Sequence, residues 1–207
     1  ITNTVNVIYP ILTLCIMEAT LRFAFDVNAN KSEVLTNSLF IIGISEVIIV
    51  LFAPFVKYMS PEMAEYWGWF SIIYLGFNCQ QVLSQYTKGI GKTTIFAVSG
   101  VVQTITIITS NILCLIVFGM GLSGYLFSMV AGYFVACSYL ILAGRVRLTC
   151  FHINKKLLLE MLRFSVPTIP TIVAWWISTS ADKYIIIAYS GVAASGVYSV
   201  AYKIPSI

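Results

Sequence analysis

The residues of this chain best suited to chemistry are the charged side chains that stand inside long apolar stretches. Glu18 and Arg22 are four residues apart, so on one helix they share a face and can form an ion pair. Each such group costs on the order of 2.5–3.5 kcal/mol at the centre of a bilayer, so pairing or function must account for it. We expect Arg22 to face a hydrated cavity with Glu18 holding it there. A self-neutralised pair that only stabilises the helix is the alternative.

A third charged group, Glu46, stands near the middle of another apolar stretch, residues 36–56. Its side chain is too short to reach water from there, so the carboxyl needs a partner or a proton. We interpret Glu46 as a candidate for ion or proton coupling, with an ion pair to Arg22 as the alternative.

Polar residues at helical spacing form a stripe along the stretch 66–86 and just beyond it. The stripe comprises Asn78, Gln81, Gln85 and Lys88. It is expected to face protein or water, either as hydrogen bonds between helices or as one wall of a substrate path. Residues 89–93 read Gly-Ile-Gly-Lys-Thr, but Tyr86 stands where a phosphate-binding loop requires glycine, which excludes nucleotide binding there.

The remaining reactive residues predict no enzyme site. His152 is the only histidine, and the five cysteines have no spacing typical of a metal site or a redox motif. We therefore expect no catalytic residue, no metal and no cofactor. The net charge of +4 is divided among short loops rather than gathered in one basic stripe, which argues against a nucleic-acid partner.

Membrane helices are the elements that must position these residues. Hydrophobic residues make up 59% of the chain and charged residues 10%, a composition far from that of a soluble domain. About 20 residues of helix are needed to cross a hydrocarbon core of ~30 Å. Stretches of that kind are 5–25, 36–56, 66–86, 94–118, 121–143 and 161–181. We predict an all-α integral membrane protein with about six complete transmembrane helices and the start of another.

The basic residues between these stretches sort onto alternate sides. Lysine and arginine near span ends are retained in the cytoplasm, so the richer side is predicted to be cytoplasmic. It holds Arg22, Lys31, Lys88, Lys92, Arg145, Arg147, Lys155, Lys156 and Arg163, against Lys57, Lys183 and Lys203 on the other side. The first span then enters from outside. Either the N-terminus lies outside or an odd number of spans precedes it. The isoleucine at position 1 favours the second interpretation, a piece of a longer protein.

A basic segment at residues 144–160 divides the chain. We predict that it is a cytoplasmic linker with an interfacial helix. Residues 1–143 would then be most of a first helical bundle, and residues 161–207 the start of a second. Pro167 and Pro170 follow the linker, and we expect them either to bend the next helix or to interrupt it at a binding site.

Several segments together resemble the Wzx-type polysaccharide flippases of the MATE-like (MOP) superfamily. They are QYTKGIGK at 85–92, RFSVPTIP at 163–170, ADKY at 181–184 and GVYSVAYKIP at 196–205, and their order and spacing match as well. EATLRF at 18–23 is similar to that family's second span. One departure is Lys88, where such proteins often carry arginine.

The resemblance implies a transporter rather than an enzyme, with two bundles around a cavity that opens alternately to each side. It implies transport of undecaprenyl-pyrophosphate-linked oligosaccharide across the bacterial inner membrane, for surface polysaccharides such as O-antigen. Implied partners are membrane lipids, a polysaccharide polymerase and a chain-length regulator. The residues expected to contact pyrophosphate or acidic sugars are Arg22, Lys88, Arg163, Lys183 and Lys203, with Glu18, Asp182 and Gln81 positioning them.

Other functions stay open at this point. A proton- or sodium-coupled exporter of drugs or metabolites, from the same superfamily, would need dominant buried carboxylates, and Glu46 is one candidate. A membrane-embedded polysaccharide polymerase would need a large extracytoplasmic loop with catalytic charges, and this sequence shows none. In a bundle whose polar residues serve only assembly, neutral substitutions at Arg22 or Lys183 would leave transport intact.

Overall fold

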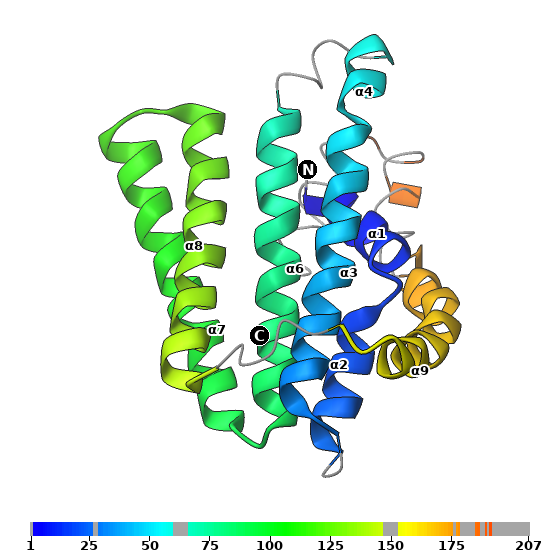
Figure 1. Cartoon of the computed structure of the whole chain (residues 1–207). Helices are drawn as coiled ribbons and strands as arrows, with labels where there is room; N and C mark the ends of the chain where they lie inside the picture. Colours follow the sequence, from blue (N-terminus) through cyan, green and yellow to red (C-terminus); the bar gives the residue numbers. More distant parts are fainter. Residues whose placement is uncertain are drawn as a thin grey trace. The chain divides into compact units, whose positions relative to one another are not determined.

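A computed structural model describes residues 2–26, 29–59, 66–146, 153–175, 177–178, 185–186, 189 and 191. Every regular element in these residues is helical, as the composition predicts. The chain forms two compact units, Ile1–Val166 and Pro167–Ile207. The helical bundle that holds the candidate sites belongs to the first unit (Figure 1).

The helices follow one another with short connections. The first unit contains α1 (Thr2–Leu12), α2 (Ile16–Phe25), α3 (Lys31–Leu51), α4 (Ala53–Met59), α6 (Trp67–Gly89), α7 (Thr93–Asn111), a π-helical segment (Ile112–Val117), α8 (Gly121–Gly144) and α9 (Lys155–Ser165). A 3-10 turn, Val166–Thr168, follows α9 at the first of the two predicted proline positions, and residues 169–175 are helical.

Among the described residues, 4 helices are long and apolar enough to cross a membrane: Lys31–Val56, Thr93–Val117, Gly121–Gly144 and Lys155–Trp175. They coincide with four of the predicted stretches, although the last begins earlier, inside the predicted linker. α6 has 23 residues and is also long enough to span, but its polar side chains lower its hydropathy. The chain is therefore an all-α membrane protein.

The first predicted span is not one continuous helix. α1 and α2 are separated by a short break, in which Leu14 and Cys15 adopt left-handed backbone with φ of 51° and 52°. Pro10 lacks an N–H and its ring crowds the preceding turn, so the helix is already weakened there. At the break, the amide of Cys15 donates a hydrogen bond to the carbonyl of Pro10 at 3.1 Å, so this carbonyl still has a partner.

Small residues let α6 pack closely against its neighbours. α6 contacts α2, α3, α7 and α8, and lies between α3 and α8 (Figure 1). Near its C-terminal end, Gly89 lies so close to α2 that a Cβ at this position would overlap the Cβ of Ala24. Near its middle, a Cβ at Gly76 would lie 3.1 Å from the Cβ of Tyr133 on α8. Close backbone approach at glycine is typical of membrane helix pairs.

The outer helices keep large apolar side chains exposed. On α7 the exposed fractions are 58% for Val101, 59% for Ile105 and 54% for Ile108, and only Ser99 of this helix is buried. Such an apolar face on the surface of a soluble protein would be costly, whereas lipid tails solvate it. The outward face of α7 is therefore suited to contact with hydrocarbon.

Helix α9 lies across the end of the bundle where α2 ends and α3 begins. At its start, the backbone carbonyl of Asn154 accepts a hydrogen bond from Asn37 Nδ2, and Asn154 Nδ2 donates to Glu33 Oε2 at 2.7 Å. At its other end, the ring of Phe164 packs under Arg22 in the last turn of α2. Met161 is fully buried between these contacts, whereas the lysines at the start of α9 are exposed. Helix α9 is therefore amphipathic, with one face packed on α2 and α3. Its position at the membrane interface stays a prediction.

Candidate functional site

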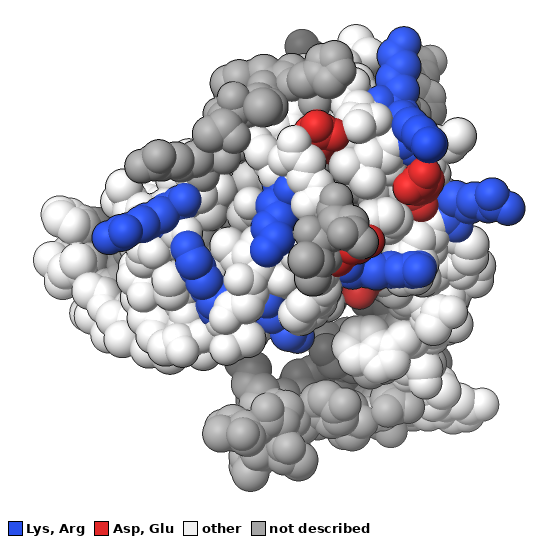
Figure 2. Space-filling view, turned by 60° about the horizontal axis from the view of Figure 1, so that its bottom comes forward, with Lys and Arg blue, Asp and Glu red and all other residues white. Residues whose placement is uncertain are grey.

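Basic side chains gather at the end of the first unit where α6 and α8 end and α7 begins. Lys92 links the start of α7 to the end of α8, because its Nζ donates a hydrogen bond to the carbonyl of Gly144 at 2.6 Å. The basic residues of this end are Arg22, Lys31, Lys88, Lys92, Arg145, Lys155, Lys156 and Arg163, and Figure 2 shows lysine and arginine side chains spread over it. All of them were predicted to share one side. Arg147, predicted for the same side, lies outside the described residues.

Two arginines line a surface hollow at this basic end. The hollow has a volume of about 280 Å³ and is formed by Arg22 and Phe23 of α2 with Glu160, Arg163 and Phe164 of α9. The guanidinium of Arg22 lies 4.3 Å from the centroid of the Phe164 ring. Neither arginine makes an ion pair or hydrogen bond within the described part of the chain. A stacked guanidinium keeps its N–H edge available to a ligand, and phosphate and carboxylate are the anions whose geometry matches that edge.

The expected pair of Glu18 and Arg22 does not form. Arg22 is exposed and turns its guanidinium onto the ring of Phe164, and Glu18 is half-buried without an ion pair to it. Helical spacing brings the two side chains to one face, but α9 offers Arg22 an aromatic surface that the sequence spacing cannot reveal. Glu18 therefore does not hold Arg22 in place.

A polar groove with a volume of about 290 Å³ lies between α6 and α7, with Tyr133 of α8 also lining it. Gln81, one of the predicted site residues, lines this groove. Lys88 lies about two turns further along α6 than Gln81. Its Nζ is 5.5 Å from the centroid of the Phe96 ring, and Phe96 also lines the groove. The structure thus places Gln81 and Lys88 along one helix pair, whereas Arg22 and Arg163 meet on another.

The predicted polar stripe differs in part from the polar face that the structure shows. Asn78 is buried and donates to the carbonyl of Tyr74 in its own helix, and Gln85 does not line the groove. The groove contains Gln80, Ser84 and Gln103 instead, which the sequence interpretation missed. A signal was present, because Gln80 adjoins Gln81 and Gln103 is a long polar side chain inside the apolar stretch 94–118.

Glu46 lies between α3 and α6 rather than beside Arg22. Its Oε1 accepts a hydrogen bond from the hydroxyl of Ser71, and its Oε2 is buried without a hydrogen-bond partner among the described residues. The carboxyl is thus partly satisfied by a neutral donor, and no arginine or lysine pairs with it there. The predicted alternative of an ion pair with Arg22 is not formed.

The sequence matches one protein-family model over most of its length, and this match shows the family of the chain. The model described as polysaccharide biosynthesis protein matches residues 7–207, which is nearly the whole chain. The chain belongs to this family. Comparisons with curated proteins and with solved structures gave no significant match. The predicted resemblance to polysaccharide flippases is therefore confirmed at the level of the polysaccharide biosynthesis family, which supports a role in polysaccharide synthesis or its passage across a membrane.

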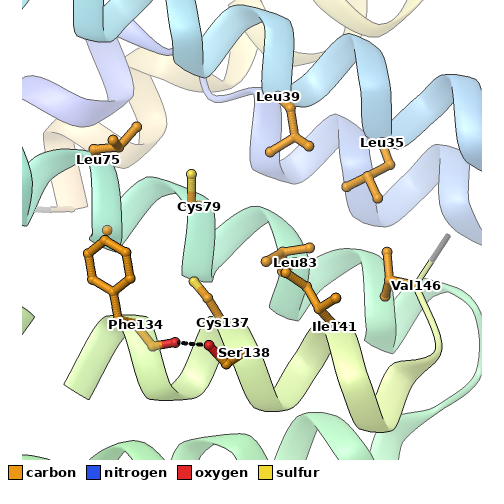
Figure 3. A pocket seen from close by; sticks show the side chains of 11 residues that line it. Leu35, Leu39, Leu75, Cys79, Leu83, Phe134, Cys137, Ser138, Ile141 and Val146 are labelled. Carbon is orange, nitrogen blue, oxygen red and sulfur yellow. Dashed lines mark hydrogen bonds between the residues drawn. The ribbon is translucent and has the colours of Figure 1, made fainter. Parts of the chain in front are cut away.

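This polysaccharide biosynthesis protein also has an apolar pocket of about 390 Å³ between α3, α6 and α8 (Figure 3). Leu39, Leu75 and Phe134 contribute to its lining. The hydroxyl of Ser138 donates to the carbonyl of Phe134 within α8, so it offers no donor to the pocket. Such a lining suits an apolar chain rather than a charged group.

Three predicted site residues cannot be placed. Asp182, Lys183 and Lys203 lie outside the described residues. Within the residues that are described, no group of His, Cys, Asp and Glu side chains is arranged to hold a metal ion.

Proposed function

We propose that this chain is part of a flippase that moves undecaprenyl-pyrophosphate-linked oligosaccharide from the cytoplasmic to the outer leaflet of the bacterial inner membrane. The observation that carries the proposal is the hollow at the basic end, where Arg22 and Arg163 both lack an anionic hydrogen-bond partner among the described residues. Membership of the polysaccharide biosynthesis family supports it. Transport would proceed by alternating access between two helical bundles.

A pyrophosphate head group cannot enter hydrocarbon unaided, because an unpaired charge in an apolar medium is very costly. Guanidinium groups at the membrane surface can replace its lost solvation with charge-assisted, bidentate hydrogen bonds. The hollow is at the end of the first unit that is predicted to be cytoplasmic, and such a substrate would be loaded from that side. Glu160 also lines the hollow, so its carboxylate would reduce the positive potential there.

Further roles extend the same proposal. Glu46 is the candidate for coupling transport to an ion or a proton, because it has a buried oxygen without a partner. Lys88 and Gln81 would contact the substrate along α6, and Lys183, Lys203 and Asp182 would act in the second bundle. The apolar pocket in Figure 3 suits the hydrocarbon chain of a membrane lipid. A polysaccharide polymerase and a chain-length regulator would act downstream.

The test uses the whole protein in its own bacterium, with the gene deleted and then restored. We expect the deletion to abolish surface polysaccharide and to trap lipid-linked units on the cytoplasmic face of the inner membrane. Wild type should restore export. Arg22→Ala should lower the export rate about 10-fold or more, because charged hydrogen bonds contribute about 1.5–3 kcal/mol each. Arg22→Lys should be intermediate, since it keeps the charge and loses the stacked, bidentate geometry.

Lys31→Ala is the matched control, because Lys31 is an exposed basic residue at the same end that does not line the hollow. It should export normally. Normal surface polymer in the deletion strain, with altered tolerance to cationic compounds, would overturn the flippase and favour the ion-coupled exporter. Full export by Arg22→Ala would reject the role given to the hollow.

A further inference from the structure

The groove between α6 and α7 is lined by polar as well as apolar residues, unlike the outward face of α7. Long carboxamide side chains from both helices line it, accompanied by hydroxyl groups and aromatic rings. Its residues are Phe77, Gln80, Gln81, Ser84, Phe96, Ala97, Ser99, Gly100, Gln103 and Tyr133. On α7, Ala97 and Gly100 contribute almost no side chain, and a Cβ at Gly100 would meet nothing within 4 Å, so the groove stays open on that side.

No described residue pairs with the carboxamides of this groove. Gln80, Gln81 and Gln103 make no hydrogen bond to other described residues, although Gln80 is only 8% exposed. Each carboxamide offers two N–H donors and a carbonyl acceptor. Leaving them unsatisfied against lipid tails would cost several kcal/mol for each group. The groove is therefore suited to hold water or a polar ligand, and its volume of about 290 Å³ leaves room for either.

The aromatic residues of the groove narrow the class of ligand. The rings of Phe77 and Tyr133 meet edge to face, with centroids 6.0 Å apart, and Phe96 lines the same groove from α7. An anion would not use these ring faces, because their π electrons are negative. An organic cation would use them but would be repelled by the ammonium of Lys88 over Phe96. A purely apolar ligand would leave the glutamines unsatisfied. A sugar ring has both features, because its hydroxyls pair with carboxamides and its C–H faces pack on aromatic rings.

Lys88 lies beside the groove and could bind a phosphate there. Its ammonium lies over the ring of Phe96, at the end of the groove nearer the basic end of the bundle. A substrate with a phosphate near Lys88 would carry its first sugar units toward Gln81 and Gln80. We propose that the α6/α7 groove is a binding subsite for an uncharged sugar unit of the transported oligosaccharide. This inference rests on the proposed flippase function and adds the part of the substrate that the groove recognises.

The test compares two lipids that differ only in the sugar. The whole protein, in lipid nanodiscs, is titrated with undecaprenyl pyrophosphate and with the same lipid bearing the oligosaccharide of the source bacterium. Wild type should bind the sugar-bearing lipid more tightly. The double variant Gln81→Leu/Gln103→Leu should lose about 10-fold in affinity for that lipid, because each lost hydrogen bond is expected to weaken binding about 2- to 10-fold. Its affinity for the bare lipid should stay unchanged.

Gln85→Leu is the matched control, because Gln85 is the same residue type on α6 and does not line the groove. It should bind both lipids as wild type does. The single variants Gln81→Leu and Gln103→Leu, each monodisperse on gel filtration, report separately on the two helices if the double variant does not fold. Equal wild-type affinity for the two lipids, or unchanged sugar binding in the variants, would overturn the subsite and leave the flippase standing. Failure of wild type to bind either lipid would overturn both.

Discussion

At the scale of single residues, one buried pair of hydroxyl groups joins α2 to α3. Thr20 Oγ1 and Ser38 Oγ lie 2.7 Å apart, and both are also within hydrogen-bond distance of carbonyls in their own helices. Each hydroxyl has one hydrogen, so one of the two must donate across the interface or share its hydrogen between both acceptors. This contact joins α2, which carries Arg22, to α3.

We predict that Thr20→Val lowers the free energy of unfolding by about 0.6 kcal/mol, with an upper limit near 1.7 kcal/mol, as for other hydrogen bonds between membrane helices. The loss is small because the Ser38 hydroxyl keeps the carbonyl of Val34 as an acceptor. Unfolding of the purified protein in mixed micelles measures it. A double-mutant cycle with Ser38→Ala supplies the control, and strictly additive single losses would show that the two hydroxyls do not interact.

The residue scale also shows what spacing can and cannot predict. Arg22 was expected to be functional from its place inside an apolar stretch, and the structure does place it in a hollow with Arg163. Its contact with Phe164 joins two segments far apart in the sequence. Spacing alone suggested that Arg22 pairs with Glu18. This pair does not form, because α9 presents an aromatic ring on which the guanidinium stacks instead.

At the scale of helices, the polar face of α6 is set by its neighbour. Successive residues of an α-helix are about 100° apart, so a stripe containing Gln81 can continue through Asn78 and Gln85 or through Gln80 and Ser84. Contact with α7 selects the second arrangement. The periodicity predicted that a polar face exists, and only the packing of α7 showed which residues belong to it.

We predict that Gly89→Ala destabilises the bundle by about 1–3 kcal/mol, because the added methyl would overlap the Cβ of Ala24 and force α2 away from α6. Gly100→Ala is the matched control. It lies inside helix α7 with nothing within 4 Å of an added Cβ, so alanine should stabilise by up to about 1 kcal/mol through helix propensity. The thermal midpoints of both variants in detergent measure the difference. Equal midpoints would contradict the close packing of α2 and α6.

At the scale of the whole molecule, the gathering of basic residues at one end predicts the orientation in the membrane. In a background without cysteine, we expect Lys31→Cys to react with a membrane-impermeant maleimide only after the membrane is opened. Met120→Cys, between α7 and α8 at the opposite end, should react in intact cells. Both positions are exposed, so accessibility within the protein does not separate them. The reverse labelling pattern would place the basic end outside.

The sequence by itself determined that the protein is an all-α membrane protein, where the longest apolar helices lie, and which basic residues share an end. These properties depend on composition and on the length of apolar stretches, which are local. Only the tertiary structure decided that the first span breaks at Leu14 and Cys15, that Arg22 stacks on Phe164, and that α6 and α7 enclose a groove. These features depend on which helices pack together, and contacts between distant segments leave no periodic signal in the sequence.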